Sequence, residues 1–167
     1  MPSNLWAPWR YPWIKASKDG VHDCFLCDAL RDDSAMDRDN LVLFRGDSAF
    51  VILNRYPYSN GHLMVVPNRH VHDLRQVSGE EAGEMHRLVQ QSLDAMHKSL
   101  GPHGFNLGYN LGRVSGAGLE EHLHMHIVPR WNGDTNFMPV VGDVKVISQD
   151  LYDSYDQLWN AWHELQL

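Results

Sequence analysis

Cysteine is scarce in this sequence: only Cys24 and Cys27 occur among 167 residues. A single Cys-x-x-Cys pair cannot supply the several disulfides of a small secreted domain, and it predicts metal binding or redox chemistry instead. A run of about 18 apolar residues, which a membrane span requires, is also missing. The N-terminal sequence lacks the basic segment and apolar stretch of a secretory signal. We therefore expect a cytoplasmic protein that contacts no membrane.

Positive charge is also in short supply. The 14 Lys and Arg residues are outnumbered by 21 Asp and Glu residues, which gives a formal net charge of −7. This balance argues against a nucleic-acid polymer as partner. A phosphorylated small molecule is still compatible, because backbone N–H groups in a loop can hold an anion locally. The length and the 43% hydrophobic content suit one domain with a sizeable core.

Helices and strands are mixed along the chain, without internal repeats or low-complexity segments. Ser78 and Glu81 form a capping box, apolar residues then recur at helical spacing, and Gly101 ends a helix predicted over residues 79–100. A last amphipathic helix is expected at 150–165, a single helical turn at 27–31 and a loop at 32–40. Short apolar segments predict five strands, at residues 41–44, 49–53, 62–66, 105–109 and 119–130. The hairpin-length connections predict an α+β fold with a mainly antiparallel sheet of about five strands.

Three histidines alternate with apolar residues in the run HLHMHIV at residues 122–128. Side chains of a strand alternate between its two faces, so His122, His124 and His126 are expected on one face, about 7 Å apart. Burying three imidazoles on one face is costly unless they are used. An imidazole is a neutral nucleophile near pH 7 and a good leaving group afterwards, so the run predicts covalent catalysis.

A glycine-rich loop at residues 112–118 precedes the histidines. Glycine permits positive φ angles and close approach, so several backbone N–H groups of such a loop can point toward an anion. Together with a nucleophilic histidine, the loop suits attack on a phosphorus atom. Two other interpretations stay open at this point. The histidines could be satisfied core residues, or the His-x-His pairs could chelate a metal.

The run HLHMHIV resembles the signature of the histidine triad (HIT) superfamily, His-φ-His-φ-His-φ-φ with φ apolar. Asn54-Arg55-Tyr56-Pro57 and the segment GHLMVVP at residues 61–67 resemble further parts of that family. The resemblance implies a HIT-like α+β fold with one long helix and a C-terminal helix. It implies one domain over 1–167, with an N-terminal arm at 1–20, a HIT core at 24–131 and an extension at 132–167. The arm and the segment Pro129-Arg130-Trp131 resemble the bacterial branch similar to diadenosine tetraphosphate phosphorylases and hydrolases.

The resemblance also implies roles for individual residues. His124 is the nucleophile that accepts a nucleotidyl group, and His126 and His62 assist at the phosphates and orient its ring. Asn54 binds the ribose. This chain departs from many members before the first histidine, where the loop is one residue longer and lacks a hydroxyl. Trp131 follows the catalytic strand and is a candidate for stacking on the base. The expected phosphate contacts are Asn110, Ser115, Gly116, Ala117 and Gly118.

A metal site is implied for the cysteine pair. In the zinc-containing branch of the family, the two cysteines join two histidines, which here gives Cys24, Cys27, His70 and His122, with His72 as an alternative to His70. Two thiolates and two imidazoles form a closed tetrahedral set, which is typical of structural Zn²⁺. The alternative is a pair of buried thiols without metal. No organic cofactor is implied.

We therefore expect a dimeric nucleotidyl hydrolase or transferase. It should cleave dinucleoside polyphosphates such as diadenosine tetraphosphate at the α-phosphate, through a nucleotidyl-histidine intermediate. The alternatives are a nucleoside phosphoramidase, a nucleotide-binding protein without turnover, and a hydrolase that uses the histidines as metal ligands. The sequence leaves open the base, the polyphosphate length, and whether water or phosphate is the final acceptor.

Overall fold

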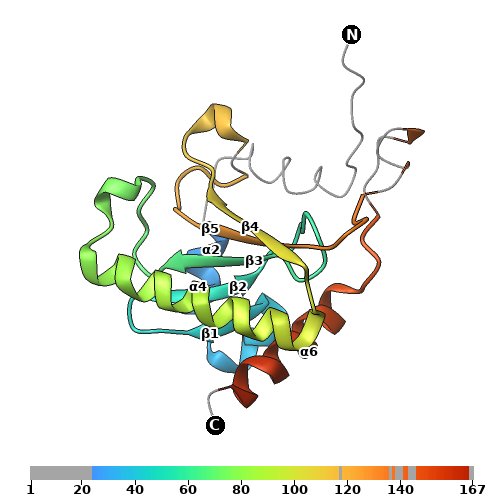
Figure 1. The fold of residues 1–167 in the computed structure, drawn as a ribbon. Coiled ribbons are helices and arrows are strands. Elements are labelled where there is room, and N and C mark those ends of the chain that lie inside the picture. Colours follow the sequence, from blue (N-terminus) through green and yellow to red (C-terminus); the bar gives the residue numbers. More distant parts are fainter. Residues whose placement is uncertain (1–23, 117, 136, 138–140, 143–145, 166–167) are drawn as a thin grey trace.

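A computed structural model describes residues 24–116, 118–135, 137, 141–142 and 146–165. Its centre is one antiparallel sheet of five strands in the order β1-β2-β3-β5-β4 (Figure 1). The bounds are Val42–Arg45 for β1, Ala49–Leu53 for β2, Leu63–Pro67 for β3, Gly104–Tyr109 for β4 and Met125–Arg130 for β5. Two long helices, α4 at Gly79–Leu100 and α6 at Leu151–Glu164, pack on this sheet. The predicted α+β class is confirmed.

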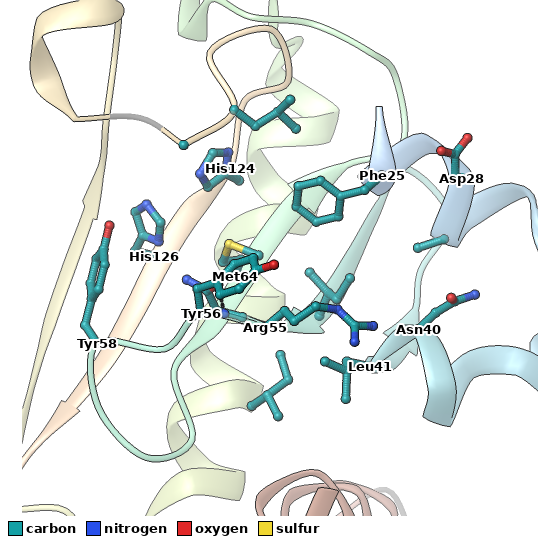
Figure 2. Close-up of a pocket in the computed structure, with 16 residues that line it drawn as sticks. Phe25, Asp28, Asn40, Leu41, Arg55, Tyr56, Tyr58, Met64, His124 and His126 are labelled. Atoms are coloured by element: carbon teal, nitrogen blue, oxygen red, sulfur yellow. Dashed lines mark hydrogen bonds between the residues drawn. The ribbon is translucent and has the colours of Figure 1, made fainter. Parts of the chain in front are cut away.

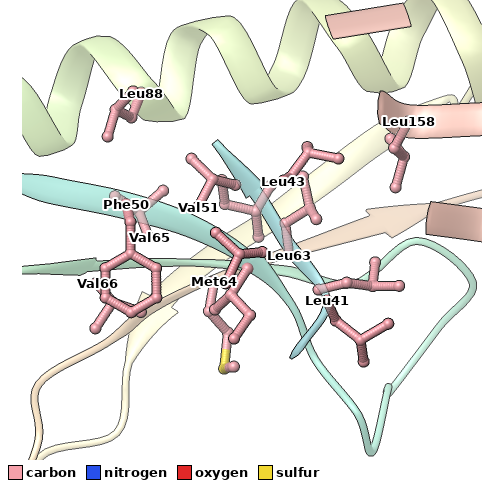
Figure 3. Close-up of a cluster of buried hydrophobic side chains, with 14 of the residues drawn as sticks. Leu41, Leu43, Phe50, Val51, Leu63, Met64, Val65, Val66, Leu88 and Leu158 are labelled. Carbon is pink, nitrogen blue, oxygen red and sulfur yellow. The ribbon is translucent and has the colours of Figure 1, made fainter. Parts of the chain in front are cut away.

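The core lies between the sheet and the helices. All residues of β2 and β3 are buried, and these strands pair in continuous register from Ala49 opposite Pro67 to Leu53 opposite Leu63. Figure 3 shows Leu88 of α4 and Leu158 of α6 approaching the apolar side chains of β1, β2 and β3. Central strands buried on both faces need continuous apolar runs, which explains why residues 49–53 and 63–66 show no polar alternation.

Both long helices begin and end where the local sequence predicts. The Ser78 hydroxyl accepts from the Glu81 backbone N–H at 3.2 Å, and the Glu81 carboxylate accepts from the Ser78 N–H at 2.8 Å. Gly101 adopts the left-handed conformation at φ 57°, which a helix end of this type requires. At the start of α6, the Asp150 carboxylate accepts from the Tyr152 N–H at 2.8 Å.

The prediction of a loop at residues 32–40 is wrong. After α2 at Phe25–Arg31 come a short 3₁₀ helix, η2 at Ser34–Met36, and one helical turn, α3 at Asp37–Asn40. The Asp33 carboxylate caps η2 through the Ala35 N–H at 2.8 Å. Arg45 of β1 donates to the carbonyl groups of Ala29 and Leu30 at 2.8 and 2.7 Å. This contact between distant segments holds the end of α2 against the sheet.

The strand expected at residues 119–130 begins only at Met125. β4 ends at Tyr109, opposite Met125, and β3 pairs with β5 only from Leu63 opposite Ile127 to Val65 opposite Met125. No described strand is available to pair with the residues before Met125. His122 and His124 therefore lie in the segment that leads into β5.

Two further expectations concern segments that the structure does not describe or describes only in part. The expected arm at residues 1–20 lies outside them, and the extension at 132–167 is described in part. Among the helices that the structure describes, none has the length and hydropathy needed to cross a membrane.

Candidate active site

A cavity of about 290 Å³ opens beside the histidines (Figure 2). Its walls come from α2, from the ends of β2 and β3 with the loop between them, and from the segment that leads into β5. One part is mainly apolar, and His124 and His126 stand at another part. The lining residues are Phe25, Asp28, Ala29, Asn40, Leu41, Ile52, Leu53, Asn54, Arg55, Tyr56, Tyr58, Met64, Gly118, Leu119, His124 and His126.

The His124 ring is held in one protonation form by the backbone. Its Nδ1 lies 2.8 Å from the carbonyl oxygen of His122. A carbonyl only accepts, so Nδ1 carries the proton and Nε2 keeps its lone pair. Burial lowers the pKa of His124, partly opposed by this hydrogen bond. The ring is therefore neutral at pH 7, with a nucleophilic nitrogen available to a ligand in the cavity.

A second set of contacts fixes the protonation form of His62, which is fully buried behind His126. The Tyr58 backbone N–H donates to His62 Nδ1 at 3.1 Å. The Asn54 side chain accepts from the Tyr56 N–H through its oxygen, so its Nδ2, 3.2 Å from His62 Nδ1, also donates. Two donors at Nδ1 require the proton of neutral His62 to be on Nε2.

This protonation form is passed on to His126. His62 Nε2 lies 3.0 Å from His126 Nδ1, so His62 donates and His126 accepts. Burial, together with His124 nearby, lowers the pKa of His126 to about 4. Neutral His126 then carries its proton on Nε2, which lies 3.3 Å from the Asn110 side-chain nitrogen. A half-turn of the Asn110 amide would place its oxygen there as acceptor. His126 thus carries an N–H group beside His124.

The structure brings together the three predicted catalytic residues and some of the predicted substrate-binding residues. His124, His126, Asn54 and Gly118 line the cavity, and His62 touches His126 from behind. The ring centroids of His124 and His126 are 4.8 Å apart, edge to face. His122 does not line the cavity and instead faces the cysteines. The three histidines of the run therefore serve two adjacent places, His124 and His126 the cavity and His122 the cysteine cluster.

The glycine-rich loop is only partly at the cavity. Ser115 and Gly116 lie in an exposed turn and do not line the cavity, and the Ser115 hydroxyl donates to the Gly112 carbonyl at 2.6 Å. Gly116 has φ 85°, a left-handed backbone conformation that favours glycine. Ala117 lies outside the described residues. Asn110 reaches the site through His126.

Trp131 does not lie where the sequence predicts. It does not line the cavity, and its indole N–H donates to the Leu100 carbonyl at the end of α4 at 3.3 Å. β5 ends at Arg130, so Trp131 lies just beyond the strand that carries His126 and packs at the end of α4 instead. The expected stacking of Trp131 on a base in this cavity is therefore not supported.

Other cavity residues were missed at the sequence level. Phe25 and Asp28 reach the cavity from α2, and Asn40 comes from α3. Their positions depend on how these short helices dock, for which the sequence carries no local signal. Arg55 and Tyr58 follow Asn54 in the loop between two buried strands. That placement beside a predicted ribose-binding residue is the signal that could have identified them.

A second cluster lies next to the cavity and contains Cys24, Cys27, His70 and His122. Their potential ligand atoms all lie within 4.8 Å of one another. Cys24 Sγ is 3.2 Å from His122 Nδ1, and Cys27 Sγ is 3.2 Å from His70 Nδ1. His122 Nε2 donates to the Pro67 carbonyl at 2.9 Å, which leaves Nδ1 as a ligand atom. Burial raises the pKa of Cys24 to about 11. Two sulfurs and two nitrogens fit a closed tetrahedral metal site, and His72 is not part of the cluster.

The comparisons with known proteins agree with this geometry. The model of the HIT domain matches residues 36–133. A protein of Mycobacterium tuberculosis named AP-4-A phosphorylase is 44% identical over 126 residues, which cover 75% of this chain and 65% of that protein. The chain thus spans just under two thirds of the length of these relatives.

Two further matches extend the comparison. An adenosine 5'-monophosphoramidase of Schizosaccharomyces pombe is 30% identical over 84 residues, which cover 50% of this chain and 59% of that protein. A Zn-bound histidine triad family protein from Mycobacterium smegmatis has a similar structure, with a TM-score of 0.67, 25% identity, and coverage of 86% of this chain and 96% of that one. With the matched domain covering more than half of its residues, the chain belongs to the HIT family.

Proposed function

We propose that this protein is an enzyme that cleaves dinucleoside polyphosphates, such as diadenosine tetraphosphate, at the α-phosphorus. The observation that carries the proposal is the geometry of His124, a buried neutral imidazole whose Nε2 lone pair is available beside an apolar cavity and an N–H donor. The M. tuberculosis relative named AP-4-A phosphorylase supports the choice of substrate.

The substrate can be placed from the chemistry of the walls. A nucleoside fits the apolar part of the cavity, with the Asn54 side chain near the ribose. The α-phosphate then lies at His124, where the N–H of His126 and the backbone beside Gly118 stabilise negative charge on its oxygens. We keep Asn110, Ser115, Gly116 and Ala117 as proposed phosphate contacts, since a bound polyphosphate extends beyond the cavity.

The reaction proceeds in two balanced steps. His124 Nε2 bonds to the α-phosphorus, the bond from this phosphorus to the bridging oxygen breaks, and the polyphosphate leaves with the electron pair. The His122 carbonyl stabilises the positive charge that forms on the imidazole. A water or phosphate oxygen then bonds to the phosphorus, the P–N bond breaks, and its electron pair returns to His124 Nε2. When water is the acceptor, its proton is released to solvent. Two displacements replace one difficult displacement.

The test compares wild-type protein with His124→Ala on diadenosine tetraphosphate, with and without inorganic phosphate. We expect the wild type to cleave the substrate and the variant to lose at least about 10³-fold in rate, as other covalent nucleophiles do. ADP formed only with phosphate identifies phosphorolysis, and AMP with ATP identifies hydrolysis. Full activity in a folded His124→Ala variant would contradict the proposal.

One relative favours a second candidate function. The S. pombe monophosphoramidase suggests assaying an adenosine phosphoramidate in parallel. Turnover of that substrate, with little cleavage of the tetraphosphate, would favour a phosphoramidase. Tight binding of AMP without any product from either substrate would instead favour a nucleotide-binding protein without turnover.

We also propose that Cys24, Cys27, His70 and His122 hold a structural Zn²⁺. The donor set and its closure within 4.8 Å support this, as does the Zn-bound protein of similar structure. A bound Zn²⁺ would supply cross-linking between α2 and the segment that carries the nucleophile. The protein residues perform the chemistry, since His124 and His126 belong to no part of this cluster. Two cysteines that form no disulfide are consistent with the cytoplasm, which we propose as the location.

A homodimer is proposed as well. β4 is an edge strand of the described sheet, paired there with β5 alone. Its middle residues, Asn106 and Leu107, are exposed. An edge with free backbone donors and acceptors and an exposed leucine is a suitable surface for pairing with a second copy.

A further inference from the structure

Tyr58 stands against the two assisting histidines. Its ring centroid lies 4.7 Å from that of His62 and 5.6 Å from that of His126. Its backbone N–H donates to His62 at 3.1 Å, so both the main chain and the ring are anchored. The residue nevertheless stays 42% exposed, and within the described chain its hydroxyl has no hydrogen-bond partner. The phenol is thus a fixed donor that a solute can reach.

Tyr58 and His126 lie on one side of His124, and the apolar part of the cavity lies on the other. Figure 2 shows Tyr58 next to His126, with His124 between this pair and the side where Phe25, Asp28 and Asn40 lie. The apolar walls that suit a nucleoside belong to the Phe25 side. A polyphosphate whose first nucleoside occupies that side therefore continues past His124 toward His126 and Tyr58.

The two reaction steps give a function to the side of the cavity where His126 and Tyr58 lie. In phosphoryl transfer the attacking and leaving atoms lie roughly in line, so the leaving phosphate departs away from His124. In the second step the acceptor must approach from the direction that the leaving group vacated. One position near His126 thus holds the leaving phosphate first and the acceptor afterwards.

We propose that the Tyr58 hydroxyl donates a hydrogen bond to the phosphate group at this position, and that it favours phosphate over water as acceptor. The inference rests on the proposed function. In the favoured step, a phosphate oxygen bonds to the phosphorus of the nucleotidyl group, the P–N bond breaks, and its electron pair returns to His124 Nε2. The product is a nucleoside diphosphate. Water in the same position would give the monophosphate.

The experiment measures products of diadenosine tetraphosphate cleavage while inorganic phosphate is titrated. For the wild type, we expect the ratio of ADP to AMP released from the intermediate to rise with phosphate. Tyr58→Phe keeps the ring on both histidines and removes only the donor. Because a hydrogen bond to a charged group contributes about 1.5–3 kcal/mol, we expect the variant to need about 10-fold more phosphate or higher for the same ratio.

Controls separate a phosphate contact from a structural role. Tyr152→Phe removes the hydroxyl of a partly buried tyrosine of α6. Tyr152 does not line the cavity, so this variant should leave the phosphate titration unchanged. The melting temperature and the pH profile of Tyr58→Phe should equal those of the wild type.

An unchanged phosphate titration in Tyr58→Phe would overturn the inference. So would a wild type that cleaves the substrate but forms no ADP from the intermediate at any phosphate concentration. A wild type without any cleavage would contradict the proposed function itself, and the inference with it.

Discussion

At the scale of single residues, one backbone N–H determines the proton positions of two side chains. The amide of Tyr58 can only donate, so His62 must accept at Nδ1 and donate from Nε2. His126 must then accept at Nδ1 and present its own Nε2–H beside His124. The pKa of His126, lowered to about 4 mainly by burial, keeps this arrangement neutral near pH 7. We therefore propose that His62 is a positioning residue that acts through His126.

Substituting His62 tests this arrangement. Glutamine can accept from the Tyr58 N–H through its oxygen and donate to His126 through its amide, whereas alanine can do neither. We expect His62→Ala to lower kcat on diadenosine tetraphosphate by about 10- to 100-fold, because a buried hydrogen bond of about 1–3 kcal/mol is lost. His62→Gln should recover most of that loss.

The melting temperature of both variants is measured alongside, since His62 is fully buried. A purely structural role would lower the melting temperature and the rate together in both variants. Equal rates for glutamine and alanine, at equal stability, would show that the proton position of His126 does not matter.

At the scale of elements, α2 depends on contacts that are distant in sequence. It has seven residues, and Cys24 at its N-cap makes no side-chain capping bond. Isolated helices of this length are not stable in water, so tertiary contacts must hold α2. Arg45 binds its C-terminal carbonyls, and the cluster with His70 and His122 meets its first turn. Because α2 forms one wall of the cavity, its docking also shapes the side of the cavity on which Phe25 lies.

Removal of the metal should therefore destabilise α2 and the segments that it contacts. We expect one Zn²⁺ per chain by elemental analysis, and a chelator should lower the melting temperature by more than about 5 °C, since a structural metal contributes several kcal/mol. His70→Ala should lose the bound metal and its chelator response. His72→Ala is the matched control, because His72 lies two residues away and outside the cluster. A chelator response that His70→Ala retains would contradict the assignment of His70 as a ligand.

The elements also show what the sequence can predict. The ends of α4 depend on Ser78, Glu81 and Gly101, which act within one turn, so they were predictable. The start of β5 depends on where β4 and β3 stop pairing, which no local pattern contains. In the same way, the resemblance identified His124 and Asn54, whereas Phe25 and Asp28 reach the cavity only through the docking of α2.

At the scale of the whole molecule, the two edges of the sheet differ. β1 at one edge packs against α6 and α3, whereas β4 at the other edge has a half-exposed strand with Leu107 at 45% exposure. Exposed strand edges invite pairing with another chain, and proteins that stay monomeric protect them with charges or cover. β4, with the sequence GFNLGY, carries no charge. The proposed homodimer would cover this edge, with which no other strand of the described residues pairs.

A single charge on that edge tests the dimer. We expect the wild type to sediment with twice the chain mass of 19.2 kDa, and Leu107→Lys to shift toward the monomer, because pairing across a two-fold axis brings a buried lysine near its own copy. Leu74→Lys is the matched control: Leu74 has a similar exposure of 42% but lies in η3 at Leu74–Gln76, outside the sheet. Sedimentation equilibrium over a range of concentrations gives the dissociation constants. A dimer equally stable in both variants would place the interface elsewhere, and a monomeric wild type would show that β4 remains unpaired in solution.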